Sequence, residues 1–503
     1  ESHLRREITL VIDRSGSMEG EKIEQARRAA RQVIAGLEHG EAFNIITYAD
    51  DVEFYADEPV VKSRTTALDA GKYIDSINAR GGTNLHEALK TSLQPEPDAE
   101  RLPIVLFLTD GLPTVGEVNE HAIRGLAKDQ NPHEKRIFTF GVGVDVNTPL
   151  LDKLATTTRA FATFVLPGQD VETSVSKVFR GLDGPSLASP VLNVLNRRGR
   201  NAPSRVSDIL PSTLPDMYEG DQMVILGRYR GNKPLVFRVT GNYYGEERTF
   251  ERTFSPRESA SSDRPTDFVA RLWASRKIAQ LIDTIRDMGG EQMTATQTSD
   301  ASTFTNASAT TEARLKELTD EIVRLSTEFG ILTEYTSFLA TQGVDMSNEE
   351  QVSAEAMENL RIRAFTCRSG EGSVNQELNN SMQRNQRWCN TGNFYWDANM
   401  QQSAIVTVQQ CNTRSLYRRG DRWISSELVA DEDSVEPDRT VEFGSDEFLQ
   451  LLWQLVAANR NSELALEGDI LLTVNDETIL IKAPPRPEPE SDENSTPDES
   501  SDQ

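Results

Sequence analysis

The stretch EITLVIDRSGSM, residues 7–18, joins a run of apolar residues to a row of side-chain oxygens. The apolar part is typical of a buried strand, and it ends at Asp13, which Ser15 and Ser17 follow at alternate positions. Aspartate, serine and glycine are common in turns, so a turn alone would account for this row. Oxygen side chains at this spacing also bind hard cations. The pattern D-x-S-x-S occurs by chance about once in eight chains of this length, so its meaning depends on what the fold places beside it.

Strands and helices alternate from Glu7 to about Arg180. The run LPIVLFLTD, residues 102–110, is apolar almost throughout, which is typical of a central parallel strand covered on both faces. Residues 42–57 read as two closely joined strands, which favours an antiparallel pair at the edge of the sheet. This order predicts a doubly wound α/β fold with a mainly parallel sheet and right-handed crossovers. Helices are expected over residues 21–37, 66–77, 85–93, 119–130, 148–158 and 170–182, and further strands over residues 136–143 and 160–166.

Two other segments are expected at the same sheet edge as Asp13. In a doubly wound sheet, ligands bind beyond the carboxyl ends of the strands, where the strand order reverses. Asp110 ends the strand expected beside the first one, and Gly111 allows a tight exit from it. The segment GGTN, residues 81–84, carries Thr83 on a loop whose glycines permit a close backbone approach. Taken singly, Asp110 would serve as a helix cap and Thr83 as a turn residue, but two acids and three hydroxyls at one edge predict a metal site.

This set of residues resembles the metal-ion-dependent adhesion site (MIDAS) of von Willebrand factor type A domains. The motif is complete, with DRSGS for D-x-S-x-S, GGTN for the threonine and LTDG for the second aspartate. The resemblance implies that Ser15 and Ser17 contact the ion directly, whereas Asp13 and Asp110 act mostly through waters. Thr83 would bind directly or through water, depending on state. The implied ion is Mg²⁺, or Ca²⁺ or Mn²⁺, and neutral hydroxyl ligands would leave it able to accept an Asp or Glu carboxylate from another protein.

Longer segments extend the resemblance, which for the type A domain covers roughly residues 5–182. VLPGQDVETSVSKVFRGLDGPSLASPVL, LPDMYEGDQMVILGRYRG, RLWASRKIAQLID and STEFGILTEYTSFLA are similar to segments of inter-alpha-trypsin inhibitor heavy chains and their bacterial relatives. In that group a β-rich VIT domain precedes the type A domain, so we expect upstream sequence to have been removed. The segment QCNTRSLYRRGDRWISSEL fits the bacterial branch better than the animal one. No DPHF-like segment occurs, so the animal proteins' covalent attachment to hyaluronan is not carried over.

The rest of the chain is expected to form smaller units. Strand-like runs with no helix between them predict a β-sandwich or part of one after the type A domain. Two amphipathic helices should then pack together, with a polar, low-complexity loop between them. An Asn/Gln-rich stretch, residues 345–392, is expected to be partly irregular, and residues 294–311 and the Pro-rich acidic tail to be disordered. The expected boundaries are 1–185 for the type A domain, 186–260 for the β-sandwich-like segment, 261–345 for the helical segment with its polar loop 289–311, 346–483 for a small mixed α/β region and 484–503 for the tail.

The composition of the chain limits the classes of partner that it is expected to bind. The 503 residues carry a formal net charge of −26, with a pI of about 4.7. Nucleic acids and anionic membranes need a basic face, so neither is an expected partner. No run approaches the roughly 18 apolar residues of a membrane span. Cys367, Cys389 and Cys411 lack a C-x-x-C element and a neighbouring histidine, so we expect small buried hydrophobes, or one disulfide with an odd thiol, rather than a zinc site.

Two functions are consistent with these features. The first is a metal-dependent adhesion or interaction protein in the extracellular space or cell envelope, which binds a partner's carboxylate through the ion. The alternative is an intracellular type A adaptor that works with an AAA+ ATPase in complex assembly or metal insertion. An enzyme is not expected, because HEALK at His86 lacks the second histidine of H-E-x-x-H. The chain also contains no G-x-x-x-x-G-K-[ST] loop and no G-x-S-x-G elbow.

Overall fold

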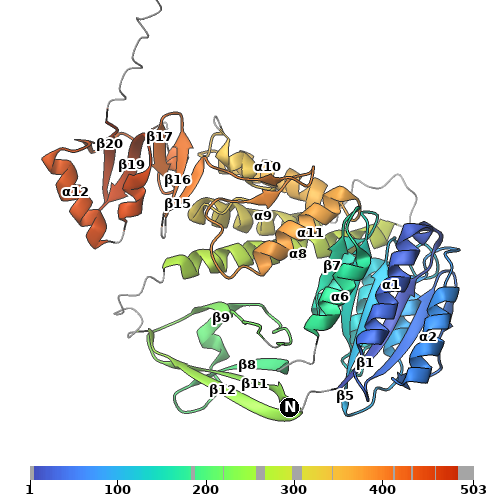
Figure 1. Ribbon diagram of the computed structural model, residues 1–503. Helices are drawn as coiled ribbons and strands as arrows, with labels where there is room; N and C mark the ends of the chain where they lie inside the picture. Colours follow the sequence, from blue (N-terminus) through green and yellow to red (C-terminus); the bar gives the residue numbers. More distant parts are fainter. Residues whose placement is uncertain are drawn as a thin grey trace, which may run out of the picture.

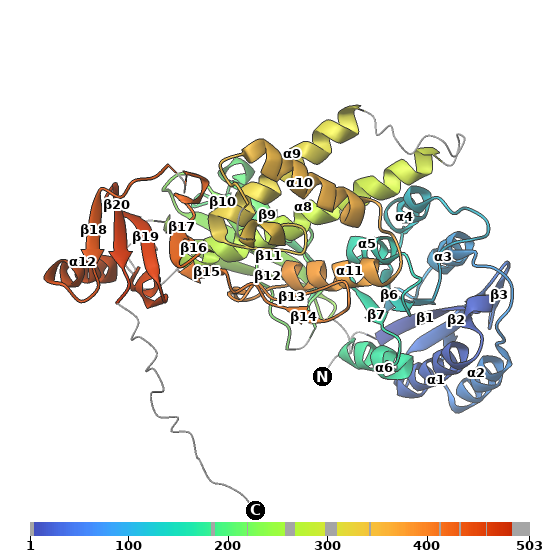
Figure 2. The same ribbon diagram turned by 90° about the horizontal axis from the view of Figure 1, so that it is seen from above.

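A computed structural model of the chain shows three consecutive parts: an α/β domain, a helical body with small sheets beside it, and a C-terminal sheet (Figure 1). Figure 2 shows the helical body between the other two parts. No described helix is long and apolar enough to cross a membrane. The structure describes residues 5–182, 187–218, 220–256, 267–296, 309–341, 344–411, 414–431, 434–458 and 460–484.

The α/β domain is built on one seven-stranded sheet in the order β3-β2-β1-β5-β6-β7, with β4 paired to β2. Strand β1 lies parallel between β2 and β5, and β6 and β7 continue the parallel series. The short strand β3 is antiparallel to β2 and lies at the edge, as the sequence predicted. The strands are β1 (Arg5–Asp13), β2 (Ala42–Tyr48), β3 (Val52–Phe54), β4 (Val60–Val61), β5 (Arg101–Thr109), β6 (Arg136–Val142) and β7 (Ala162–Val165).

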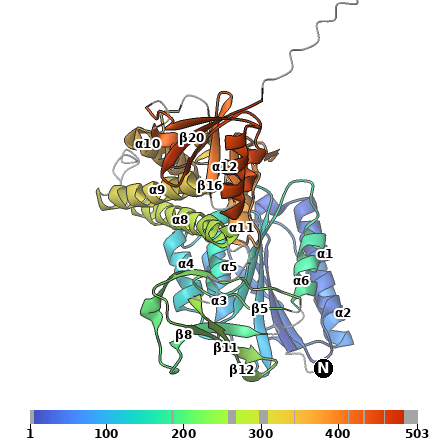
Figure 3. The same ribbon diagram turned by 90° about the vertical axis from the view of Figure 1, so that its left-hand side faces the viewer.

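Helices cover both faces of this sheet (Figure 3). Because successive side chains of a strand point to opposite faces, Ile8, Leu10 and Ile12 of β1 pack with α1, α2 and α6, whereas Val11 packs with α3, α4 and α5. This arrangement confirms the doubly wound, mainly parallel α/β fold. The helices are α1 (Glu21–Gly36), α2 (Arg64–Ser76), α3 (Leu85–Leu93), α4 (Glu120–Asp129), α5 (Thr148–Thr157) and α6 (Val171–Gly181).

The segment expected as a β-sandwich is β-rich but is not a sandwich. A three-stranded antiparallel sheet has the order β12-β11-β8, and β9 pairs with β10 in a separate two-stranded sheet. Residues 246–253 of β12 are all exposed, so no second sheet among the described residues covers this strand and none of them forms a sandwich core with it. The strands are β8 (Ala188–Asn196), β9 (Val206–Leu210), β10 (Leu226–Tyr229), β11 (Leu235–Tyr243) and β12 (Glu246–Phe254).

The helical body extends beyond the boundary expected at residue 345. Leu360 and Ala364 share one apolar core with α8 and α9, so the following helices belong to the same unit. The Asn/Gln-rich stretch, expected to be partly irregular, is helical over residues 349–365 and 371–384 and irregular before, between and after them. Residues 289–296 and 309–311, expected in a polar loop, are helical, and residues 297–308 of that loop lie outside the described residues, as do residues 485–503 of the tail. The helices are α8 (Asp267–Thr296), α9 (Ala309–Phe329), α10 (Glu349–Leu360), a π-helical turn (Arg361–Phe365) and α11 (Glu371–Arg384).

A six-stranded sheet of order β15-β16-β17-β19-β20-β18 packs against one helix, α12 (Asp446–Ala457), at the C-terminal end. Two short strands, β13 (Tyr395–Trp396) and β14 (Gln402–Ser403), precede it. All three cysteines are free thiols, so the disulfide alternative is wrong. The strands are β15 (Val408–Cys411), β16 (Arg414–Arg419), β17 (Arg422–Ser425), β18 (Arg439–Glu442), β19 (Asp469–Val474) and β20 (Glu477–Lys482).

Buried polar contacts join the α/β domain to the helical body. Arg384 at the end of α11 binds Asp152 of α5, with 2.7 Å between Nη2 and Oδ1. The hydroxyl oxygens of Thr148 and Ser373 lie 2.6 Å apart and share a hydrogen bond between the same two helices. Residues of the α/β domain and of the helical body are therefore removed from water at this contact. Helices α4 and α5 lie on the side of the domain that faces the helical body.

Candidate metal centre

The carboxylate of Asp13 is held in place at the carboxyl end of β1. One oxygen, Oδ1, accepts a hydrogen bond from the main-chain N–H of Ser15 at 2.8 Å. The other, Oδ2, accepts hydrogen bonds from the hydroxyls of Thr109 at 2.7 Å and Tyr48 at 3.3 Å. The side chain is fully buried. Burial raises the pKa of Asp13 above its usual value, and the Asp110 carboxylate adds to the rise, while the hydrogen bonds from Ser15 and Thr109 oppose it.

Three further oxygens form a hydrogen-bonded row beside Asp13. The hydroxyl oxygens of Ser15 and Ser17 lie 3.0 Å apart, and the Ser17 hydroxyl donates to Oδ1 of Asp110 at 2.8 Å. Asp110 is buried directly after β5, which pairs with β1, so the two strand ends bring both carboxylates to one edge. Ser17 is exposed. Both ends of the row are therefore buried, and its middle member, Ser17, reaches solvent.

The loop that carries Thr83 closes the other side of this site. Its Gly81 carbonyl accepts a hydrogen bond from the main-chain N–H of Gly16 at 2.9 Å, which ties the two loops together. The hydroxyl oxygens of Thr83 and Ser17 each lie 3.7 Å from the position that a β-carbon on Gly111 would take. Thr83 and Ser17 thus flank the same point of the β5 exit. The structure brings together all five residues that the sequence singled out.

Lys22, in the first turn of α1, also reaches this site and was not predicted. Its ammonium nitrogen lies 2.6 Å from Oδ2 of Asp110. Tyr48 and Thr109, which orient Asp13, were not singled out either. Each of the latter is the last residue of a strand beside β1, and that position in the sequence is the signal that would have found them. Lys22 gives no such signal, because it lies at the start of a helix whose packing decides where it points.

These residues fit a small, hard cation. Six oxygens arranged octahedrally at 2.0–2.1 Å from Mg²⁺ are about 2.9 Å from their neighbours. The two contacts in the row of Ser15, Ser17 and Asp110 measure 3.0 and 2.8 Å. Within the described ranges, no cluster of three or more His, Cys, Asp or Glu side chains has the makings of a metal site. An ion at this edge would therefore be held by two acids and neutral hydroxyls, the donor set expected from the sequence.

Comparison with known domain families agrees with the fold. The profile of the von Willebrand factor type A domain matches residues 7–177, which run from β1 into α6 and include every residue of the site. Residues 7–177 form a von Willebrand factor type A domain. Domains of this family commonly bind a divalent metal ion.

The similarity to curated relatives extends beyond the type A domain. The inter-alpha-trypsin inhibitor heavy chain H4 of Homo sapiens is 27% identical over 368 residues, which are 70% of this chain and 36% of the human protein. Heavy chain H2 of Sus scrofa is 24% identical over 366 residues, again 70% of this chain and 36% of the relative. This chain therefore spans about a third of the length of these relatives.

One solved structure matches the chain in part. A von Willebrand factor type A protein from Catenulispora acidiphila is 16% identical, covers 72% of this chain and 89% of its own, and superposes with a TM-score of 0.42.

Proposed function

We propose that the type A domain binds a partner protein through a divalent ion, Mg²⁺ in the first instance, held by Asp13, Ser15, Ser17, Thr83 and Asp110. The partner supplies an Asp or Glu carboxylate. The protein acts by binding and not by catalysis.

One observation carries this proposal: the hydrogen-bonded row that runs from Ser15 through Ser17 to Asp110 at a solvent-exposed sheet edge. Two of its three members are neutral hydroxyls, which contribute no charge to an ion. The Asp13 carboxylate, whose two oxygens already accept hydrogen bonds, is fixed behind the row. An ion in this setting would be only partly neutralised, and its chemistry would be that of a Lewis acid open to one more anionic oxygen.

The residues have separate tasks in this proposal. Ser15 and Ser17 offer oxygens to the ion, and the buried carboxylates of Asp110 and Asp13 balance its charge. Tyr48 and Thr109 keep the Asp13 carboxylate in one orientation, because both hydroxyls donate to the same oxygen. The oxygen spacing favours Mg²⁺ over Ca²⁺, since ligands at the longer Ca²⁺ distances of about 2.3–2.6 Å would stand farther apart.

The test is a calorimetric titration of Mg²⁺ into the wild type and three variants. Asp110→Ala should abolish binding at millimolar Mg²⁺, because one of the two anions is lost. Ser15→Ala should weaken binding less, since water replaces a neutral hydroxyl. Asp57→Ala, which removes an exposed aspartate of the β3–β4 loop, is the matched control and should bind as the wild type does. The proposal fails if the wild type takes up no ion or if Asp110→Ala binds it equally well.

A further inference from the structure

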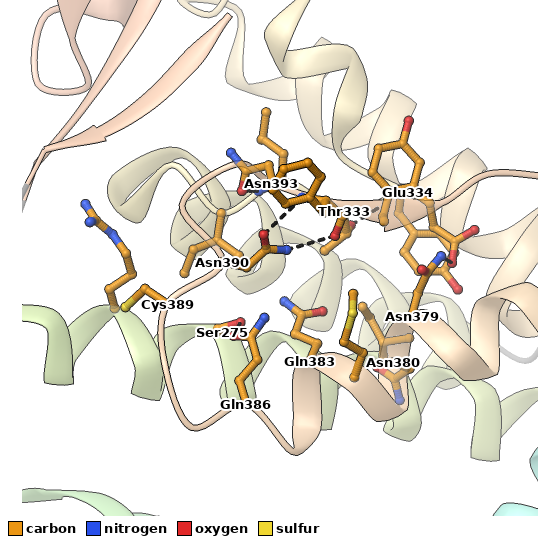
Figure 4. Close-up of a pocket in the computed structure, with 18 of the residues that line it drawn as sticks. Ser275, Thr333, Glu334, Asn379, Asn380, Gln383, Gln386, Cys389, Asn390 and Asn393 are labelled. Carbon is orange, nitrogen blue, oxygen red and sulfur yellow. Dashed lines mark hydrogen bonds between the residues drawn. The ribbon is translucent and has the colours of Figure 1, made fainter. Parts of the chain in front are cut away.

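A second pocket lies in the helical body, away from the metal centre. It is open to solvent and is bounded by α8, α11, residues 331–335 and residues 389–395 (Figure 4). Its wall combines apolar groups with an unusual number of side-chain amides. The amide residues are Asn379, Asn380, Gln383, Gln386, Asn390, Asn393 and Gln410.

The charged groups of the wall are engaged within the protein. The buried carboxylate of Glu334 is paired with Arg363 and also accepts a hydrogen bond from Asn379 at 3.0 Å. The guanidinium of Arg271 donates to the main-chain carbonyl of Phe329 at 3.2 Å and to that of Arg414 at 2.8 Å. A ligand in this pocket would therefore contact amide and apolar groups rather than an unpaired charged group.

Several of these amides bind the protein's own main chain through both of their polar atoms. Asn379 accepts from the N–H of Trp396 at 2.7 Å and donates to its carbonyl at 2.8 Å. Asn390 does the same with Phe394, accepting from its N–H at 3.1 Å and donating to its carbonyl at 2.8 Å. A side-chain amide carries one donor and one acceptor side by side, which matches the N–H and C=O of a peptide unit.

Along α11, the amides form a row in which one member has no partner. Asn375, Asn379 and Gln383 lie at intervals of four residues, so they succeed one another along one side of the helix. Asn375 donates to the carbonyls of Trp396 at 3.2 Å and Asp397 at 2.9 Å, and Asn379 holds Trp396 as described. The side chain of Gln383 makes no hydrogen bond to any residue that the structure describes. Figure 4 shows it pointing from α11 into the pocket, toward Asn390 and Thr333.

Strand β13 does not extend as far as the Gln383 amide. The β13 strand follows the first two amides of the row, but at Phe394 the chain turns away into the loop that Asn390 holds. Two apolar side chains of the same pocket wall are exposed, Met382 at 38% and Phe394 at 46%. The pocket thus offers an amide for a main chain and an apolar surface for a side chain.

We propose that this pocket binds an extended, uncharged peptide segment of a partner protein, whose main chain is held by Gln383 and whose apolar side chain packs on Met382 and Phe394. The segment continues the line of β13 along α11. A sugar presents neighbouring hydroxyls that an amide also binds, but the amides of this wall already bind main chain at two places, which favours the peptide. This site is independent of the metal centre.

The experiment uses the full chain and an array of end-blocked, uncharged 12-residue peptides, with a glycan array in parallel and EDTA in both. The wild type should retain a subset of the peptides. The strongest of these is then titrated by calorimetry into the wild type, Gln383→Ala and Gln454→Ala, an exposed glutamine on α12 that serves as the control. Gln383→Ala should weaken binding about tenfold and Gln454→Ala should not, since only the former loses main-chain hydrogen bonds.

Versions of that peptide methylated at one main-chain nitrogen at a time identify the contact. Methylation at the residue that faces Gln383 should weaken binding to the wild type about tenfold and leave binding to Gln383→Ala nearly unchanged, because that hydrogen bond is already absent. The thermal midpoint of Gln383→Ala should equal that of the wild type, which excludes misfolding. Retention of no peptide, binding of a glycan that Gln383→Ala abolishes, or equal methylation losses in both proteins would each overturn the proposal.

Discussion

At the scale of single residues, the contact between Lys22 and Asp110 bears most directly on the metal centre. The ammonium lies 2.6 Å from Oδ2, while Oδ1 of the same carboxylate receives the Ser17 hydroxyl. A cation of the protein itself is therefore placed against one of the two anions that a metal ion would use. The lysine side chain is 37% exposed, so it is free to move away, but it competes electrostatically with any ion that binds there.

We predict that Lys22→Gln raises the affinity for Mg²⁺. An ion pair at this exposure is worth about 1 kcal/mol at most, so the gain should be up to about fivefold. Calorimetric titration measures it directly. Lys72→Gln is the matched control, because Lys72 pairs with Asp69 on the exposed side of α2 and should leave the affinity unchanged. Weaker Mg²⁺ binding by Lys22→Gln would show that the lysine helps to build the site instead of competing with the ion.

At the scale of elements, the loop between α2 and α3 decides where Thr83 lies. Gly81 has a φ of +74°, in the region that favours glycine, and a β-carbon there would clash with the carboxylate of Asp50. The same carboxylate accepts a hydrogen bond from the N–H of Gly82 at 3.0 Å. The loop's close approach to the DRSGS turn thus depends on a glycine at this position.

Gly81→Ala should therefore lower both stability and Mg²⁺ affinity. The unfavourable φ should cost about 1 kcal/mol, and the displaced Asp50 carboxylate should shift the loop and withdraw Thr83 from the site. Gly168→Ala is the control, because Gly168 has a φ of +83° with nothing within 4 Å of an added β-carbon. It should show the loss of thermal stability alone. Equal Mg²⁺ affinity in Gly81→Ala and the wild type would mean that Thr83 contributes nothing to the ion.

At the scale of the whole molecule, a buried charge cluster joins the type A domain to the helical body. Arg384 binds Asp152 of the domain at 2.7 Å and Asp283 of α8 at 2.9 Å, and Arg286 pairs with Glu377. Three carboxylates thus lie around two guanidiniums, and the Lys153 ammonium is a further positive charge near Asp152. Burial, together with the Asp152 carboxylate, raises the pKa of Glu377 to about 8.

This pKa predicts how stability changes with pH. In the unfolded chain Glu377 ionises near its ordinary value of 4.5, so between pH 4.5 and about 8 unfolding releases a proton. The stability that the protonated form contributes is complete below pH 4.5 and is lost as the pH rises through 8. Glu377→Gln keeps a neutral side chain at every pH and should remove this part of the decline, which is on the order of 2 kcal/mol between pH 6 and pH 9.

Thermal unfolding of the wild type and Glu377→Gln at pH 6 and pH 9 checks this prediction. The variant should already be the more stable protein at pH 6, and its advantage should be larger at pH 9. Glu350→Gln on the exposed face of α10 is a suitable control and should follow the wild type. Parallel curves for the wild type and Glu377→Gln would show that Glu377 is ionised throughout, with its charge fully compensated by the two arginines.

Much of the type A domain and its site followed from the sequence alone. The alternation of apolar runs and amphipathic segments predicts parallel strands with helices on both faces, and the carboxyl ends of such strands share one edge. Asp13 and Asp110 each follow a buried strand directly, so their meeting could be expected without any structure. The signal is local, because a strand's direction determines where the residue after it must lie.

Tertiary packing decided the rest. The stretch 345–392 is rich in Asn and Gln, which form helices less readily than alanine does, yet residues 349–365 of it are helical because Leu360 and Ala364 bury themselves against α8 and α9. The approach of Lys22 to Asp110 and the free amide of Gln383 depend on how helices pack, which no short sequence pattern encodes. Burial against residues far along the chain is a property of the assembled fold. The sequence therefore determined the sheet and the candidate metal ligands at its edge, and the tertiary structure decided what surrounds them.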